Sequence, residues 1–189
     1  MKNYWFISDT HFNHSNFLAF KRDDGTPCRD FDSIKEMNEL IIENWNKAIK
    51  PQDKVYHLGD VIMGDPKKYD KILSRLNGKK RLVIGNHDIE KLKHISKYFQ
   101  KISGARDLNI NGFKCIISHI PLHPSCLERF GVNIHGHIHD RILGRKEFKI
   151  QPRPLKILET VIIPQPNYLN VCVERTDYKP INLEEIIDK

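Results

Sequence analysis

Five short apolar runs, each followed by polar residues, organise the sequence. Each run has the length of a strand and leads into a carboxylate, an amide or an imidazole. The five are residues 5–8 before Asp9 and His11, 55–58 before Asp60, 82–84 before Asn86 and His87, 115–118 before His119, and 132–135 before His137 and His139. Because the ends of several strands meet at one edge of a sheet, the pattern predicts a cluster of oxygen and nitrogen metal ligands.

Three helices are predicted from capping residues and apolar spacing. Ser33 and Glu36 form a capping box, and the helix that follows is expected to end before Pro51. Asp65, placed before a proline, starts a second helix that is expected to end at Gly78, and a third covers residues 89–99. Their apolar positions are interpreted as core faces: Ile34, Met37, Ile41 and Trp45, then Tyr69, Ile72, Leu73 and Leu76, then Leu92, Ile95 and Phe99.

The second half of the chain is expected to change character. Asn111 and Gly112 lie between two strand-like runs, and such a pair readily adopts the two positive φ angles of a type I′ hairpin. We expect this hairpin to open a half rich in antiparallel strands. Residues 141–166 are rich in proline and are expected to form an irregular loop around a strand at 155–163. The last predicted elements are a strand over 168–174 and a short helix capped by Asn182 and Glu185.

Length and composition fit one soluble α/β domain over residues 1–189. No apolar stretch approaches the roughly 20 residues that span a bilayer, and a strand begins at once, so a cytoplasmic protein with no membrane partner is expected. The four cysteines include no Cys-x-x-Cys pair, which favours reduced thiols over a zinc ribbon. The net charge of +7 suits a phosphate-bearing partner but selects no function, and the oligomeric state stays open.

The ordered motifs closely resemble those of the calcineurin-like metallophosphoesterase superfamily, and within it a group of small, stand-alone bacterial and phage phosphoesterases. They are Asp-x-His at 9–11, Gly-Asp at 59–60, Gly-Asn-His-Asp at 85–88, the isolated His119 and Gly-His-x-His at 136–139. The resemblance runs from residue 4 to about residue 140. It implies an α/β fold, a two-sheet mixed β-sandwich flanked by helices in α/β/β/α order. It also implies a metal-dependent hydrolase that acts on phosphate esters.

The resemblance further implies a binuclear centre. Asp9, His11, Asp60 and His139 would hold one divalent ion, and Asp60, Asn86, His119 and His137 the other. Asp60 would bridge the two ions, because two oxygens on one carbon can bind two cations and cancel part of their repulsion. The mixed ligands accept manganese, iron, nickel, cobalt or zinc, and manganese is expected.

His87 resembles the catalytic imidazole of the family, and Asp60 is assigned as the second catalytic residue. A hydroxide bridging the two ions would attack phosphorus, and His87 would protonate the leaving oxygen or stabilise the phosphoryl group. Either Asp60 or Asp88 could orient His87, and the sequence leaves this open. The candidates for contact with the substrate phosphate are His14, Asn16, Asn86 and His87.

Other polar side chains are given structural explanations. His57 is expected to be a buried, hydrogen-bonded group, His94 an exposed helix residue and His135 a core residue or a support for the ligands. His123 and Arg141 are interpreted as solvated loop residues. A basic face near the second helix is interpreted as solvated, since no aromatic residues accompany it; its members are Lys67, Lys68, Lys71, Arg75, Lys79, Lys80 and Arg81.

The expected substrate is a nucleotide-derived phosphodiester or a short single-stranded nucleic acid rather than long duplex DNA. His87 favours a diester, because an alkoxide leaving group gains from proton donation. A phosphomonoesterase of the same fold and a non-catalytic metal-binding scaffold stay open as alternatives. A mononuclear zinc hydrolase is disfavoured, because the chain has no His-Glu-x-x-His helix.

Overall fold

The first three apolar runs pair side by side in one sheet. The protein is described by a computed structural model of residues 3–22, 24–152 and 155–187. Parallel strands β1 (Tyr4–Ile7), β2 (Lys54–His57), β3 (Lys79–Val83) and β4 (Lys101–Ser103) are neighbours in that order. β11 (Ile181–Asn182) adds an antiparallel strand beside β1. Ile7 pairs with His57, and His57 with Leu82, so the carboxyl ends of β1, β2 and β3 are level at one edge.

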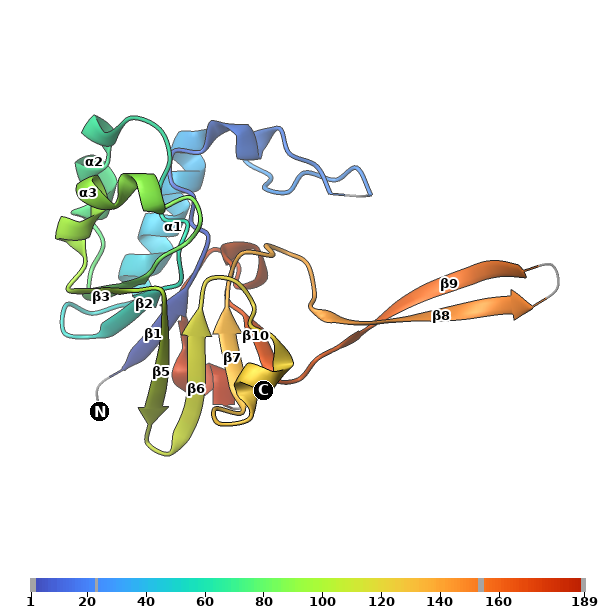
Figure 1. Ribbon diagram of the computed structural model, residues 1–189. Helices are drawn as coiled ribbons and strands as arrows, with labels where there is room; N and C mark the ends of the chain where they lie inside the picture. Colours follow the sequence, from blue (N-terminus) through green and yellow to red (C-terminus); the bar gives the residue numbers. More distant parts are fainter. Residues whose placement is uncertain (1–2, 23, 153–154, 188–189) are drawn as a thin grey trace.

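The other two apolar runs lie in a second sheet, which faces the first (Figure 1). Its order is β10 (Tyr168–Asn170), β7 (Val132–His135), β6 (Phe113–Ser118) and β5 (Ala105–Ile110). β5 and β6 form the predicted hairpin, in which φ is 53° at Asn111 and 90° at Gly112. The expected antiparallel character is confirmed for this hairpin, whereas β6–β7 and β7–β10 are parallel pairs. The crossover between β6 and β7, which contains the 3₁₀ helix η5 (Pro124–Leu127), returns the chain to its starting end.

Helix α1 (Ile34–Ala48) covers the first sheet on the face opposite the second sheet (Figure 1). It begins as predicted at Ser33, whose Oγ accepts a hydrogen bond from Glu36 N at 3.1 Å. Its stripe is buried, with Met37, Ile41 and Trp45 all 0% exposed. The stripe is therefore core, as expected.

The second predicted helix is shorter than expected. Residues 65–78 contain only η2 (Pro66–Lys68) and α2 (Asp70–Leu73) as regular turns. Side chains of α1 hydrogen-bond to the backbone carbonyls that follow α2, in place of further helical bonds. Trp45 Nε1 donates to Asn77 O at 2.9 Å, and Asn46 Nδ2 donates to Arg75 O at 2.9 Å. Residues 89–98 form three consecutive pieces, η3 (Ile89–Lys91), α3 (Leu92–Ile95) and η4 (Ser96–Tyr98).

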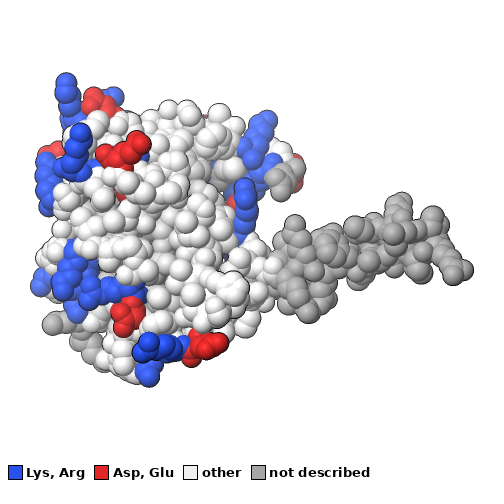
Figure 2. All heavy atoms as spheres, viewed as in Figure 1, with Lys and Arg blue, Asp and Glu red and all other residues white. Residues whose placement is uncertain are grey.

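The basic residues near α2 do not form one helix face. Lys79, Lys80 and Arg81 lie on β3, and the exposed Arg75 pairs with Glu39 at 2.5 Å. Lys and Arg side chains stand in separate groups on the face seen in Figure 2. This arrangement agrees with a solvated surface.

Two apolar cores join the layers. One lies between the first sheet and helices α1, α2 and α3, and the other lies between the two sheets. The core between the sheets contains Phe6 from β1 together with Ile117 and Ile134 from β6 and β7, all 0% exposed. The predicted fold of two mixed sheets flanked by helices is confirmed.

Residues 141–166 are more regular than predicted. β9 (Leu155–Pro164) contains the expected strand, but β8 (Gly144–Pro152) pairs with it in antiparallel register. This ribbon extends away from the two sheets (Figure 1). The proline content wrongly predicted an irregular loop, because Pro152 and Pro164 stand at strand ends. A missing N–H there disturbs the hydrogen bonds between the two strands least.

The closing strand is also shorter than predicted. β10 stops at Asn170, whose Oδ1 accepts a hydrogen bond from Cys172 N at 2.9 Å, and η6 (Val173–Arg175) follows. The final helix α4 (Leu183–Ile187) is capped as expected: Asn182 Oδ1 accepts from Glu184 N at 2.9 Å. In the described ranges, no helix is both long enough and apolar enough to cross a membrane.

Candidate metal centre

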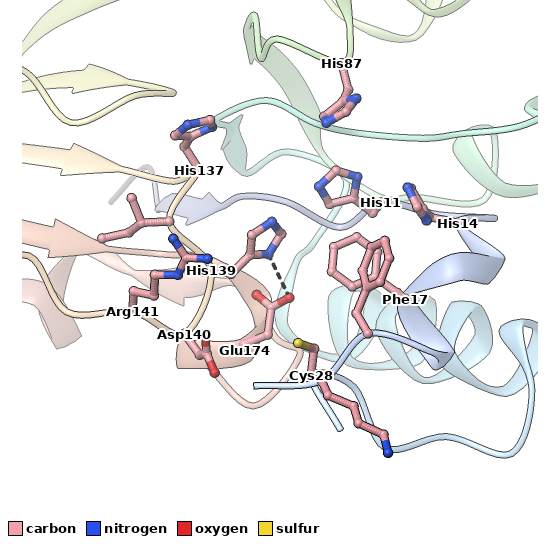
Figure 3. A pocket seen from close by; sticks show the side chains of 13 residues that line it. His11, His14, Phe17, Cys28, His87, His137, His139, Asp140, Arg141 and Glu174 are labelled. Carbon is pink, nitrogen blue, oxygen red and sulfur yellow. Dashed lines mark hydrogen bonds and ion pairs between the residues drawn. The ribbon is translucent and has the colours of Figure 1, made fainter. Parts of the chain in front are cut away.

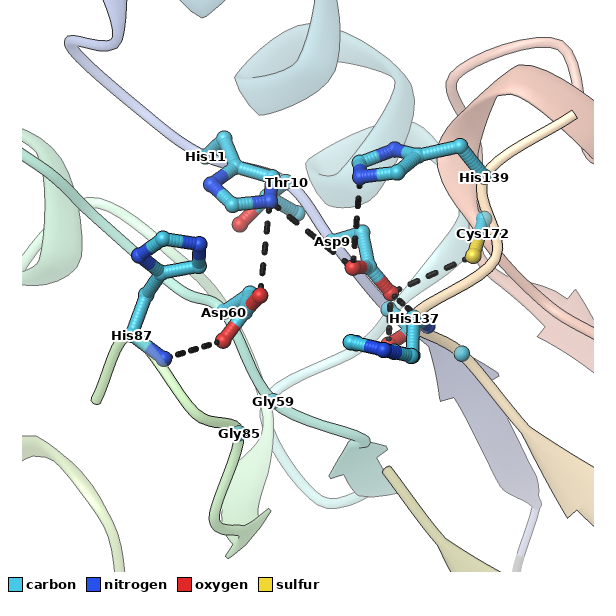
Figure 4. A network of polar contacts seen from close by, with 12 residues as sticks. Asp9, Thr10, His11, Gly59, Asp60, Gly85, His87, His137, His139 and Cys172 are labelled. Carbon is cyan, nitrogen blue, oxygen red and sulfur yellow. Dashed lines mark hydrogen bonds and ion pairs between the residues drawn. The ribbon is translucent and has the colours of Figure 1, made fainter. Parts of the chain in front are cut away.

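Polar side chains from the ends of five strands meet where the two sheets come together. Figure 4 shows Asp9, His11, Asp60, His137 and His139 among them. Two groups can each surround a cation. They are Asp9, His11 and His139, and Asp60, His119 and His137, and within each group one ligand atom per residue lies within 4.8 Å of the others. The strand-end motifs singled out in the sequence therefore converge.

The first group surrounds a free oxygen of Asp9. Its other oxygen, Oδ2, is satisfied by Ser8 Oγ at 2.5 Å, His137 N at 2.9 Å and Cys172 Sγ at 3.2 Å. Oδ1 is buried and has no hydrogen-bond partner in the described part of the chain. It lies 3.7 Å from His11 Nε2 and 3.9 Å from His139 Nε2, too far for hydrogen bonds. A buried carboxylate oxygen in this setting is suited to a cation.

Asp60 stands between the two groups. Its Oδ2 lies 3.6 Å from His11 Nε2 in the first group and 3.4 Å from His119 Nε2 in the second. Its Oδ1 accepts a hydrogen bond from His87 N at 2.9 Å. One carboxylate oxygen thus faces imidazoles of both groups, which is the geometry that a bridging ligand needs.

His119 is the centre of the second group. Its Nδ1 lies 2.7 Å from Leu58 O, so the proton belongs on Nδ1 and Nε2 is left as a ligand. Nε2 lies 2.9 Å from Asn86 Oδ1 and 3.2 Å from His137 Nδ1. Asn86 is therefore a neutral oxygen donor within the second group.

These separations fit divalent metal ions. Two ligand atoms about 2.1 Å from one ion are roughly 3.0–3.5 Å apart at octahedral or tetrahedral angles. Distances of 3.4 and 3.6 Å from Asp60 Oδ2 match that spacing, and those from Asp9 Oδ1 are slightly longer. Asp9 Oδ1 and His11 Nε2 are buried without partners in the described ranges, a penalty that a cation would remove.

The backbone is bent sharply at most of these residues. The φ angle is 56° at Asp9, 44° at His11, 57° at Asp60, 70° at His137 and 53° at His139. Asp and His enter this left-handed region more readily than most residues. Gly136 is needed for close approach, because a Cβ there would lie 2.0 Å from Ser8 Oγ and 2.3 Å from Asp9 Oδ2. These backbone conformations turn the side chains of Asp9 and His11, and those of His137 and His139, toward the two ligand groups.

Comparison with known proteins agrees with this geometry. Residues 3–152 match the calcineurin-like phosphoesterase superfamily domain. The chain belongs to this superfamily. Its members generally bind divalent metals and hydrolyse phosphate esters, and the two ligand groups described above provide places for such ions.

The chain is similar to one archaeal relative over nearly its whole length and to a phage protein over about half of it. An uncharacterized protein of Methanocaldococcus jannaschii, MJ1445, is 34% identical over 189 residues, covering 99% of this chain and 90% of the relative. The gene 66 protein of Mycobacterium phage L5 is 30% identical over 91 residues, 47% of this chain and 41% of the phage protein. The crystal structure of AQ665, a protein of unknown function from Aquifex aeolicus, is similar with a TM-score of 0.71 and 29% identity, covering 100% of this chain and 99% of AQ665.

A buried ion pair behind the first ligand group was not predicted from the sequence. Arg29 Nη2 lies 2.7 Å from Glu174 Oε1, and their side chains are 0% and 2% exposed. Glu174 Oε1 also lies 3.0 Å from His139 Nδ1. Arg29 donates to the carbonyl oxygens of Asp9 and Thr10 at 2.5 and 2.8 Å. The pair thus ties the Asp9 loop to His139. No local pattern links residues so far apart in the chain.

Asp88 organises backbone rather than His87. Its Oδ2 accepts from Asp60 N at 2.8 Å and from Gly85 N at 2.9 Å, and its Oδ1 accepts from Val61 N at 2.9 Å. Burial raises the pKa of this carboxyl. Of the two candidates, it is Asp60 that contacts His87 in the described part of the structure, through the main-chain N–H.

The protonation states of Asp9 and His11 suit metal binding. Burial by itself would raise the pKa of Asp9, but the adjacent imidazole of His11 and the charges of His119 and His139 hold it well below its usual value. Burial lowers the pKa of His11 to about 4, so its imidazole is neutral at pH 7. Burial also opposes charge on His139, but the hydrogen bond to Glu174 leaves its pKa raised. An ionised carboxylate and a neutral imidazole are the forms that bind metal.

A cavity of about 460 Å³ opens beside the first group (Figure 3). His14 and His87 both line it. His87 is exposed, with its ring centroid 5.4 Å from that of His11. Asn16 is exposed on η1 (Ser15–Leu18) and is not among the described residues that line this cavity. Arg141 is exposed, as expected for a solvated loop residue, and it also lines this cavity.

The remaining histidines lie outside both ligand groups and outside the cavity lining. His57 is 1% exposed and its Nε2 lies 2.9 Å from Thr10 Oγ1, as predicted, and burial lowers its pKa to about 3. His135 is 0% exposed, consistent with a core residue. His94 is half-buried rather than exposed, because its ring packs 6.5 Å from that of Tyr69. His123 is exposed, as expected.

Proposed function

We propose that this chain is a binuclear phosphodiesterase that acts on a small, nucleotide-derived substrate. The proposed ligands are Asp9, His11, Asp60 and His139 for one divalent ion, and Asp60, Asn86, His119 and His137 for the other. When bound, the ions would supply Lewis acidity at the phosphoryl oxygens and activate water for attack. The observation that carries the proposal is Asp60 Oδ2, which lies 3.6 Å from His11 Nε2 and 3.4 Å from His119 Nε2.

His87 is proposed as the general acid. Its backbone is held on both sides, because its N–H donates to Asp60 Oδ1 at 2.9 Å and its carbonyl accepts from Lys91 Nζ. Its imidazole lines the cavity and makes no hydrogen bond within the described residues. During hydrolysis, the water oxygen bonds to phosphorus as the bond to the leaving alcohol breaks. His87 gives its proton to the leaving oxygen and recovers one from solvent.

A diester is proposed over a monoester, with the proton of His87 assisting the departure of the alkoxide leaving group. Duplex DNA is not proposed as the substrate, since the basic side chains seen in Figure 2 stand in separate groups rather than in one track. The cytoplasm is proposed as the setting, because all four cysteines are free thiols.

The test begins with protein stripped by a chelator and reloaded with one metal at a time. The mixed oxygen and nitrogen ligands accept manganese, iron, nickel, cobalt or zinc, and we expect manganese to restore hydrolysis most readily. Initial rates would be compared on a dinucleotide, a nucleoside monophosphate and duplex DNA. We expect the dinucleotide to react fastest. Faster hydrolysis of the monophosphate would favour a phosphomonoesterase, and metal binding without turnover of any ester would favour the scaffold alternative.

His87→Ala separates metal binding from chemistry. Because His87 is not a proposed ligand, the variant should keep both ions while kcat falls by about 10²–10⁴-fold. The loss should be smaller for a nitrophenolate leaving group, which needs less proton donation. Equal losses for good and poor leaving groups would contradict the acid role. His94→Ala, on a helix away from the cavity lining, is the matched histidine control.

A further inference from the structure

Two hollows meet at His87. The larger is the cavity of about 460 Å³ beside the first ligand group, and the smaller, of about 370 Å³, lies on the Met63 and Ile89 side. His87 lines both, and Asn86 lines the smaller one. The proposed position of the scissile phosphate, beside His87, therefore has space on two sides.

The larger hollow offers a surface for a planar ring. Phe20 is 45% exposed although it is a large apolar side chain. Its ring centroid lies 5.3 Å from that of Phe17 and 5.9 Å from that of His14. Phe17 is itself held in place, because the Arg29 guanidinium carbon lies 4.1 Å from its ring centroid. A supported aromatic side chain with an exposed face is suited to stacking against a nucleobase.

The same hollow carries positive charge. Lys21 and Arg141 line it, and neither pairs with a carboxylate within the described ranges. The two carboxylates in the same lining are both paired, Asp140 with Arg22 and Glu174 with Arg29. In Figure 3, Arg141 and Phe17 lie on opposite sides of His139. Stacking rings combined with cations are the features by which proteins bind short single-stranded nucleic acids.

The smaller hollow offers apolar contact on the other side of His87. Ile89 is 63% exposed, and Met63 lines the hollow with it. Lys91, also in the lining, donates to His87 O and so fixes one wall relative to the general acid. A phosphomonoester has one substituent and would fill one hollow, whereas a phosphodiester has two.

We propose that the site is bipartite, and this inference rests on the proposed function. The scissile phosphodiester lies beside His87, a nucleoside of one alcohol stacks on Phe20 in the larger hollow, and the second alcohol contacts Ile89 and Met63 in the smaller one. The substrate class is therefore a diester with a sizeable group on each side, such as a dinucleotide.

The test compares a dinucleoside monophosphate with the methyl ester of a nucleoside 5′-monophosphate, both with the manganese-loaded protein. The two diesters share one nucleoside but differ in the second group. Ile89→Ala should raise KM for the dinucleotide at least threefold more than for the methyl ester. Phe20→Ala should raise KM for both by roughly 5- to 50-fold, the size of one lost stacking contact. Equilibrium binding of a phosphorothioate dinucleotide should weaken by similar factors.

Ile120→Ala is the matched control, because Ile120 is 52% exposed and lines neither hollow. It should leave the ratio of the two KM values unchanged. If Ile89→Ala behaves like Ile120→Ala, or if Phe20→Ala binds the phosphorothioate like wild type, the bipartite site is wrong while the proposed function stands. If wild-type protein hydrolyses neither diester, the proposed function fails and this inference fails with it.

Discussion

Asp60 is the residue on which both ligand groups depend. Its Oδ2 faces His11 Nε2 and His119 Nε2, and its Oδ1 holds His87 N. A single carboxylate therefore links the two proposed metal positions to the proposed acid. Such a residue cannot be replaced by a neutral isostere without loss of the negative charge between two cations.

Asp60→Asn should weaken both metal sites while it preserves the shape of the side chain. Because an amide offers one neutral oxygen, we expect metal affinity to fall by more than the 10–100-fold typical of outer-shell changes. Metal content per chain, measured after dialysis at a fixed manganese concentration, checks this. Asp107→Ala, an exposed carboxylate on β5, is the control. Two bound ions at wild-type affinity in Asp60→Asn would contradict the bridging role.

Gly136→Ala should damage the first ligand group by steric pressure alone. A Cβ would lie 2.0 Å from Ser8 Oγ and 2.3 Å from Asp9 Oδ2, so the Asp9 carboxylate must shift. We expect a loss of about 1–3 kcal/mol in unfolding free energy and weaker binding of one ion. Chemical denaturation and metal titration measure the two effects. Gly104→Ala, with open space around its Cβ position, should change neither.

At the scale of elements, the candidate metal centre is held in place by residues outside the strands. Arg29 lies in the loop before α1 and Glu174 on η6, and their pair joins the end of β1 to His139. Both side chains are almost completely buried. A buried charge that loses its partner is strongly destabilising, whereas an exposed one is not.

Arg29→Met should therefore reduce the free energy of unfolding by about 3–5 kcal/mol. Arg75→Met removes a comparable but exposed pair, with Glu39 at 2.5 Å and both side chains more than 40% exposed, and should change stability by about 0–1 kcal/mol. Urea denaturation of the two variants gives the comparison. The double variant Arg29→Met with Glu174→Gln should recover part of the loss. Equal losses of unfolding free energy in the two arginine variants would show that the buried pair contributes no more to stability than the exposed pair.

At the scale of the whole molecule, the candidate centre lies where the two sheets join. Asp9 and Asp60 follow strands of the first sheet, while His119, His137 and His139 follow strands of the second. The backbone also crosses this boundary, because Ser8 N donates to Val171 O at 2.9 Å. Ions held by ligands from both sheets would bind the folded chain and not the unfolded one.

Removal of metal should therefore lower the melting temperature. Saturation of one site at one hundred times its Kd stabilises the folded state by about 2.7 kcal/mol, which corresponds to roughly 5–10 °C for a chain of this size. Thermal unfolding with a chelator and then with excess manganese measures the shift. Asp60→Asn should show a smaller shift. A melting temperature that does not respond to either treatment would argue against ligands shared between the sheets.

The sequence by itself determined the local features of this protein. The strand-end motifs, the Ser33 cap and the Asn111–Gly112 turn all depend on residues a few positions apart, and the structure contains each of them. The proposed ligand side chains were assigned from the order of the same motifs and their resemblance to the superfamily. Local backbone preference is enough to specify the cap and the turn.

Only the tertiary structure decided the features that depend on packing between distant segments. The Arg29–Glu174 pair joins residues 145 positions apart. The parallel pairing of β6 with β7 depends on the direction of a crossover, and α2 is short because side chains of α1 hydrogen-bond to the segment after it. The two hollows that His87 lines are formed by side chains from segments far apart in the sequence, among them η1, η3 and η6. Such contacts depend on which surfaces meet when the whole chain folds. A short sequence pattern does not contain this information.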